Sequence, residues 1–109
     1  MDSLFLQITD GDHASNVLFV QGDLDVYSVG ETIRQGTKLI KTNDSFKIID
    51  LSQVQRFDSA GLAFVVELMK VAKQENKKIQ FKNIPIRLRA VADVYGLSQI
   101  LPDNIFQAS

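Results

Sequence analysis

A stretch of six residues, 57–62 (FDSAGL), combines an acid, a hydroxyl and two small residues, and it is the part of this chain best suited to chemistry. An apolar run that ends at Leu51 precedes it, and a long apolar pattern with helical spacing follows it directly. Backbone N–H groups at the start of a helix lack intrahelical partners and carry the positive end of the helix dipole. Ser59 is therefore a candidate helix cap, a candidate anion-facing hydroxyl or a candidate phosphorylation site, and Asp58 is a second candidate for the cap.

The remaining residues that could support catalysis are few. His13 is the one histidine, it stands in a polar loop, and the chain contains no cysteine. The missing thiols exclude disulfides, thiolate zinc sites and thiol catalysis, and nothing brings His13 to Ser59 for a Ser-His-Asp arrangement. Neither of the common glycine-rich nucleotide loops is present. We therefore expect a binding protein rather than an enzyme, with no metal and no cofactor.

Size and charge narrow the class further. The 109 residues suffice for one domain with a single core, so we expect residues 1–109 to form one domain with a short tail from about residue 100. A formal net charge of −1 gives no sign of a nucleic-acid partner. No signal peptide is recognisable, and no segment approaches the roughly 20 apolar residues of a membrane span. We expect a cytoplasmic protein without direct membrane insertion, which would reach a membrane only through a partner.

Apolar runs and helical patterns alternate along the chain. Short apolar runs between turn residues predict strands, and apolar residues three and four apart predict helices. The predicted order is strand, strand, helix, strand, helix, strand, helix, at about residues 4–8, 17–20, 25–40, 46–51, 61–75, 79–81 and 85–96. Asp25 is the candidate N-cap of the first helix. An apolar strand between two helical segments indicates an α/β fold with parallel pairing.

The helix predicted at 61–75 has a wider apolar surface than one core face requires. Its central stripe consists of Leu62, Val65, Val66, Met69 and Ala72. Phe64, Leu68 and Val71 widen the apolar arc beyond that stripe. Either a neighbouring helix covers these residues, or they belong to an exposed apolar patch that docks a partner protein beside Ser59.

Three segments together resemble the STAS domain, the family of sulphate transporter and anti-sigma-factor antagonist domains. They are residues 22–25 (GDLD), 50–52 (DLS) and 57–62 (FDSAGL), in that order and in the expected strand and helix frame. The resemblance runs from about residue 4 to residue 101. It implies a small mixed β-sheet of four to five strands with about three helices packed mainly on one side. It also implies a non-enzymatic switch or docking module.

In one branch of the family, the anti-sigma-factor antagonists, the serine directly after the aspartate is phosphorylated by a kinase that is itself the anti-sigma factor. Ser59 occupies that position, and Asp25 would help to shape the site. Members of this branch often have Ser or Thr at the next position, where this chain has Ala60. The departure keeps the hydroxyl that would accept the phosphate.

In a second branch, the Mla type, a free-standing STAS subunit binds the cytoplasmic ATPase of an inner-membrane ABC transporter that moves phospholipids. The chain looks more like this branch at residues 49–54 (IDLSQV), 58–63 (DSAGLA), 73–76 (KQEN), 94–97 (VYGL) and 100–102 (ILP). This branch often has Thr at the position of Ser59 and Gly at that of Ala60.

The resemblance to the Mla branch implies a peripheral location at the inner membrane, with an ABC ATPase as partner. The alternative is an anti-sigma-factor antagonist that a partner kinase regulates through Ser59. For either partner we predict an interface centred on Ser59, surrounded by Asp58, Ala60, Phe64 and Leu68.

Overall fold

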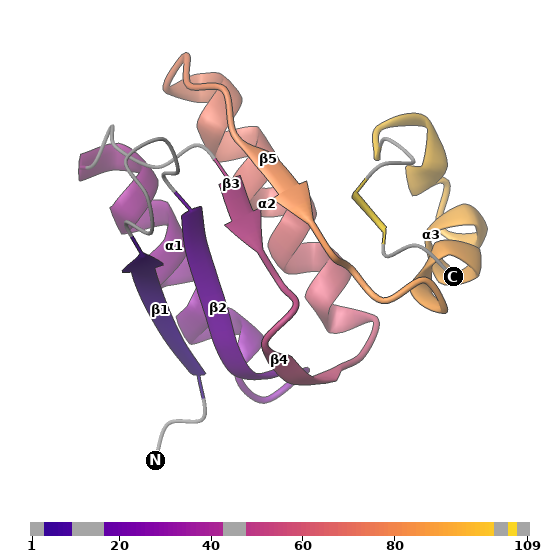
Figure 1. Cartoon of the computed structure of the whole chain (residues 1–109). Coiled ribbons are helices and arrows are strands. Elements are labelled where there is room, and N and C mark those ends of the chain that lie inside the picture. Colours follow the sequence, from indigo (N-terminus) through magenta and orange to yellow (C-terminus); the bar gives the residue numbers. More distant parts are fainter. Residues whose placement is uncertain (1–3, 10–16, 43–47, 102–104, 107–109) are drawn as a thin grey trace.

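The computed structural model describes residues 4–9, 17–42, 48–101 and 105–106, and it contains a five-stranded sheet (Figure 1). The strands are β1 (Leu4–Thr9), β2 (Val17–Leu24), β3 (Ile48–Asp50), β4 (Val54–Phe57) and β5 (Gln80–Lys82). The order across the sheet is β1-β2-β3-β5, and β4 pairs with the end of β2. The β1 strand is antiparallel to β2, whereas the other pairs are parallel. The mixed α/β fold predicted from the sequence is confirmed.

The long strand β2 pairs with β1, β3 and β4. Its side chains alternate, so that Leu18, Val20 and Leu24 are buried in the core. The pairing register shifts between Gly22 and Asp23. Gly22 has a backbone φ of 97°, which residues other than glycine rarely adopt. The GDLD segment thus supplies an irregularity in β2 between its pairing with β3 and its pairing with β4.

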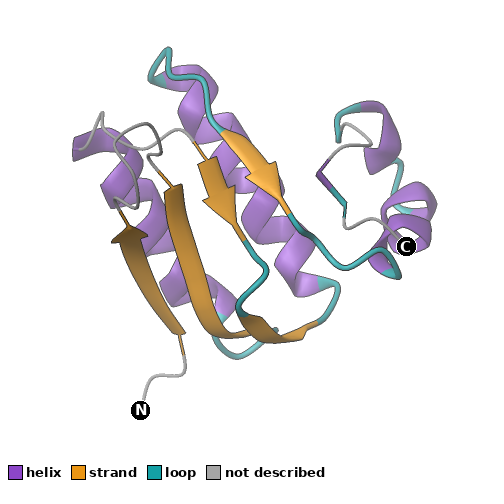
Figure 2. Ribbon diagram, viewed as in Figure 1, coloured by secondary structure: helices purple, strands orange, loops and turns teal. Residues whose placement is uncertain are grey.

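Helices α1 (Val29–Thr42) and α2 (Ala60–Gln74) lie side by side on one face of the sheet (Figures 1 and 2). Helix α3 (Leu88–Val94) and the short 3₁₀ helix η1 (Leu97–Gln99) lie beyond the β5 edge (Figure 1). Of the tail beyond Leu101, the described residues 105–106 pack on the domain, because Ile105 is buried and its carbonyl accepts the Ile84 N–H at 2.9 Å.

Two of the predicted interface residues, Phe64 and Leu68, lie in the core. Both are 0% exposed. The Phe64 ring meets the Phe81 ring edge to face, with centroids 6.5 Å apart. Leu68 packs so closely on α1 that a Cβ on Gly36 would lie 2.6 Å from its Cδ1. The prediction that these two residues contact a partner is therefore wrong.

The error has a physical reason. Helix α2 is covered on two sides, by the sheet and by α1, so its buried arc is wider than that of a helix that packs on one surface. The buried arc is also rotated from the predicted stripe, since Val71 is buried while Val66 and Met69 are only half-buried. The apolar surface that α2 leaves uncovered is therefore on its other flank, toward Val66.

The strand β4 is the one described strand that the sequence patterns did not predict. It has only four residues, of which Gln55 and Arg56 are exposed while Phe57 is buried. Its partner is the far end of β2, beyond the shift in register. This short strand ends directly before Asp58 and thereby sets the position of the Ser59 turn.

Candidate functional site

The turn between β4 and α2 is closed by Asp58, not by Ser59. The Asp58 carboxylate accepts the Ala60 N–H at 2.8 Å, and its carbonyl accepts the Gly61 N–H at 2.8 Å. The Asp58 N–H in turn donates to the Leu24 carbonyl at 3.4 Å, which ties the turn to the end of β2. An acid at this place satisfies a free helix N–H and complements the helix dipole. Of the two candidates for the cap of α2, Asp58 and Ser59, Asp58 is the residue that caps the helix.

Ser59 is exposed and makes no side-chain capping bond. Its backbone is helical, with φ −62° and ψ −22°, because Asp58 already provides the cap. The Ser59 hydroxyl therefore does not cap the start of α2, and it lies at the molecular surface. It can contact a partner or accept a phosphoryl group without loss of the cap.

Gly61 allows the buried Phe57 ring to lie against the first turn of α2. A Cβ at Gly61 would come within 2.6 Å of the ring atom Cε1 and 2.7 Å of Cζ. Phe57 is only 5% exposed, so the ring has little room to move away. The glycine of the FDSAGL segment is thus required by a close approach of side chain and helix, and this contact fixes the turn that carries Ser59.

An open groove of about 450 Å³ lies beside the turn. Its wall on the α2 side carries the predicted residues Asp58, Ser59 and Ala60. The same wall continues along the helix through the buried Leu62, the exposed Ala63 and the half-buried Val66.

The opposite wall of this groove comes from two other parts of the chain. Val26, which follows β2, and the pair Tyr95 and Leu97, which follow α3, line it. Val26 is 63% exposed and Tyr95 is 68% exposed. We call this nine-residue surface the Ser59 groove. Its lining combines the hydroxyls of Ser59 and Tyr95 and the Asp58 carboxylate with apolar side chains, a combination that is common in protein-docking surfaces.

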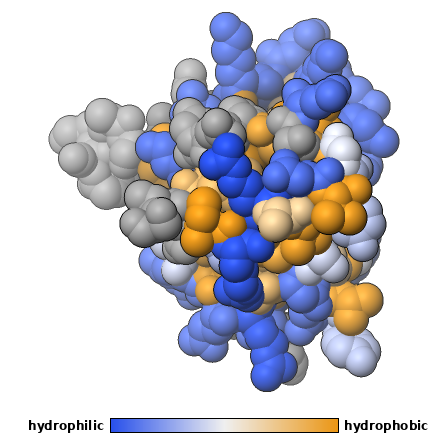
Figure 3. Space-filling model, turned by 90° about the vertical axis from the view of Figure 1, so that its right-hand side faces the viewer, coloured by the Kyte–Doolittle hydropathy of each residue, from blue (hydrophilic) through white to orange (hydrophobic). Residues whose placement is uncertain are grey.

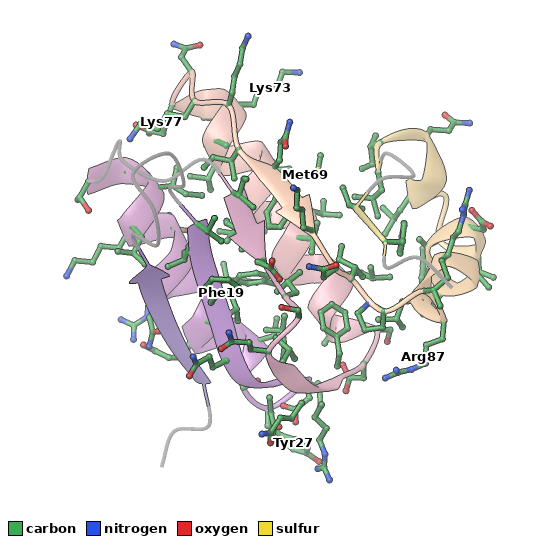
Figure 4. All side chains as sticks on the ribbon, viewed as in Figure 1. Phe19, Tyr27, Met69, Lys73, Lys77 and Arg87 are labelled. Atoms are coloured by element: carbon green, nitrogen blue, oxygen red, sulfur yellow. The ribbon has the colours of Figure 1, made fainter. Side chains whose placement is uncertain are left out.

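More exposed apolar side chains stand near the groove residues in the sequence. Tyr27, directly after Val26, is 94% exposed and projects at the end of the molecule where β4 leads into α2 (Figure 4). Val94, directly before Tyr95, is 81% exposed. On the side beyond β5, hydrophobic and hydrophilic residues lie interspersed (Figure 3). Exposed aromatic side chains of this kind are frequent anchors of protein interfaces.

Asp25 stabilises the turn that leads into α1. Its Oδ1 accepts the Tyr27 N–H at 3.0 Å and the Ser28 N–H at 3.1 Å. The Ser28 hydroxyl accepts the Asp25 N–H at 3.0 Å and donates to the Asp23 carbonyl at 2.9 Å. Asp25 thus caps the turn at residues 26–28, whereas α1 itself begins at Val29 and not directly after Asp25 as predicted. Its place as a supporting residue of the site stays a prediction, although Val26, the next residue, lines the groove.

The same bonds change the acidity of Asp25. Desolvation is the largest single influence and raises the pKa. The backbone bonds from Ser28 and Tyr27, the Ser28 hydroxyl and the charge of Arg56 lower it, and together they bring the pKa below its ordinary 3.8. The ionised form is thus the one that the fold prefers.

Sequence patterns missed the groove residues Val26, Ala63 and Val66 as partner-contact candidates, and gave Tyr95 and Leu97 only as part of a family motif. The consecutive residues Asp58, Ser59 and Ala60 line the groove, and their role as partner contacts stays a prediction. Among the described residues, no group of three His, Cys, Asp or Glu side chains could hold a metal ion. Within the same residues, no helix is long and apolar enough to cross a membrane.

Asp58→Ala should lower the free energy of unfolding by about 1 kcal/mol, because it removes the acceptor of the Ala60 N–H. Ser59→Ala should change it by less than about 0.5 kcal/mol, since the hydroxyl makes no capping bond. Urea denaturation of both variants measures the two effects. A larger loss for Ser59→Ala than for Asp58→Ala would contradict the assignment of the cap.

Asp25→Asn should lose stability mainly at neutral pH. Because the folded pKa of Asp25 lies below 3.8, its ionisation stabilises the fold above that value, and the contribution is lost as the pH falls through the folded pKa. The difference in thermal midpoint between wild type and variant should therefore be largest near pH 7 and shrink below about pH 4. A difference that grows on acidification would refute the direction of the shift.

Known proteins resemble this chain over most of its length. The family model described as "Mlab, STAS domain" matches residues 9–102. The anti-sigma-B factor antagonist of Listeria monocytogenes is 26% identical over 100 residues, which cover 91% of this chain and 85% of the relative. That of Staphylococcus aureus is 27% identical over 85 residues, covering 78% and 79%.

Solved structures agree in fold. An anti-sigma factor antagonist from Mycobacterium paratuberculosis superimposes with a TM-score of 0.62 at 20% identity, over 92% of this chain and 84% of the other. The anti-sigma factor antagonist SpoIIAA in its unphosphorylated form gives 0.58 at 16% identity, over 90% and 86%. With the family model spanning residues 9–102, the chain belongs to the STAS-domain family.

Proposed function

We propose that this protein is a non-catalytic docking module that binds a partner protein through the Ser59 groove. The observation that carries the proposal is the exposed Ser59 hydroxyl, which the Asp58 cap leaves unused, beside an open and mainly apolar groove. A serine that served only the helix would make the capping bond itself. The groove walls offer apolar side chains to bury, and the hydroxyl adds a polar contact that fixes the orientation of the partner.

The first candidate partner is an anti-sigma factor that is also a protein kinase. Relatives similar over most of their length are named anti-sigma-B factor antagonists, and Ser59 follows Asp58 as the phosphorylated serine does in that branch. Phosphorylation would add about −1.5 to −2 charges. Inside an apolar interface and next to Asp58, this charge would repel and lose its hydration, so the partner would be released.

The second candidate partner is the ATPase of an inner-membrane ABC transporter for phospholipids. The matching family model is described as "Mlab, STAS domain", and Ala60 departs from the Ser or Thr that is common beside the phosphorylated serine. In this case the protein would sit at the cytoplasmic face of the inner membrane through its partner. Ser59 would then act as a contact residue that needs no kinase.

Ser59→Glu should weaken partner binding by about tenfold or more, because it places a charge in the apolar groove. Ser59→Ala should bind within a few-fold of wild type. Isothermal titration calorimetry against the purified anti-sigma factor and the purified ABC ATPase of the same organism measures both. Gln74→Glu is the matched control, since it makes the same charge change at an exposed position at the opposite end of α2.

The two partners are separated by adding Mg-ATP to each mixture and measuring the mass of the Ser59 peptide. A gain of one phosphoryl group with the anti-sigma factor supports the first candidate. Binding of the ATPase without modification supports the second. Equal weakening by Ser59→Glu and Gln74→Glu would show that the groove is not the docking site, and no binding to either protein would reject both candidates.

A further inference from the structure

We infer that Arg87 is a positioning residue that sets the separation of the two walls of the Ser59 groove. The inference rests on the proposed docking function, but part of its test needs no partner. The Arg87 guanidinium donates from Nη2 to the Phe57 carbonyl at 2.8 Å, in a partly buried bond between residues 30 positions apart. Figure 4 shows Arg87 at the base of α3, extending toward the turn that leads into α2.

One end of this bond belongs to the α2 wall. The Phe57 carbonyl is part of the peptide that joins Phe57 to Asp58, directly before Ser59. The Phe57 ring is held against Gly61, and the Asp58 N–H is held by the Leu24 carbonyl. Because the turn is fixed at these points, a group bound to the Phe57 carbonyl is placed firmly relative to Ser59.

The other end belongs to the opposite wall. Arg87 directly precedes α3, which has only seven residues and ends one residue before Tyr95. Leu88 and Ala92 are the buried side chains of α3. Apart from these two, only the partly buried Val91 of α3 packs on the core, so one further bond can influence where this short helix lies. Tyr95 and Leu97 follow that position and line the groove opposite Ser59.

Arginine suits this task better than lysine. Its planar guanidinium presents several donors in a fixed orientation, so little freedom is lost when it binds a carbonyl. A lysine could make a single bond to the Phe57 carbonyl but would not fix the direction of approach. We therefore expect Arg87→Lys to keep part of the effect and Arg87→Ala to lose it, with the α3–η1 segment displaced from the start of α2.

The first arm of the test uses the protein alone. In two-dimensional ¹H–¹⁵N NMR spectra, Arg87→Ala should shift the amide signals of both walls, at Ser59 and Ala60 and also at Tyr95 and Leu97. Arg87→Lys should give smaller shifts along the same directions. Arg34→Ala is the control, because Arg34 is an exposed arginine on α1 whose ion-pair partner is Glu31 on the same helix.

The second arm titrates the same variants with the partner that binds wild type. Arg87→Ala should lower its affinity by about tenfold, mainly through faster dissociation, while Arg87→Lys recovers part of the loss and Arg34→Ala changes nothing. Circular dichroism checks that each variant is folded. Shifts confined to the neighbours of residues 57 and 87, or unchanged affinity for Arg87→Ala, would overturn the inference. If wild type binds neither partner, the proposed function fails, and the NMR arm still decides whether Arg87 couples the walls.

Discussion

The site depends on one hydrogen bond, from the Ala60 N–H to the Asp58 carboxylate. This bond begins α2, and with the Gly61 N–H bound to the Asp58 carbonyl it closes the turn after β4. Because the acid provides the cap, the neighbouring Ser59 adopts a helical backbone and leaves its hydroxyl at the surface. Two adjacent residues thus carry the cap and the surface hydroxyl, and a change at Ser59 need not disturb the start of the helix.

The groove is assembled from three segments that are distant in the chain. The first segment follows β2, where the turn stabilised by Asp25 presents Val26. The register shift at Gly22 precedes this turn and separates the part of β2 that pairs with β3 from the part that pairs with β4. The β4–α2 turn presents Ser59, and the α3–η1 corner presents Tyr95. Packing of α2 against both the sheet and α1 buries Phe64 and Leu68, so the flank near Val66 is the one that lines the groove.

The sequence was sufficient for the order of the helices and of four of the described strands, because periodicity and short apolar runs are local signals, and it narrowed the cap of α2 to Asp58 or Ser59. It misplaced Phe64 and Leu68, since an apolar arc gives its width but not which neighbours cover it. It also missed β4, whose four residues gain their pairing from the distant end of β2. Tyr95 reaches the groove through the placement of α3, which no local pattern encodes.

Site-specific photo-crosslinking in cells tests the docking claim most directly. A photoreactive amino acid replaces Ala63, which is exposed and lines the groove, or Gln74, which is exposed at the other end of the same helix. We predict that position 63, and not position 74, becomes joined to one protein, which mass spectrometry identifies as an anti-sigma factor or an ABC ATPase. Equal crosslinking of that protein from both positions, or crosslinking from position 74 alone, would contradict the account.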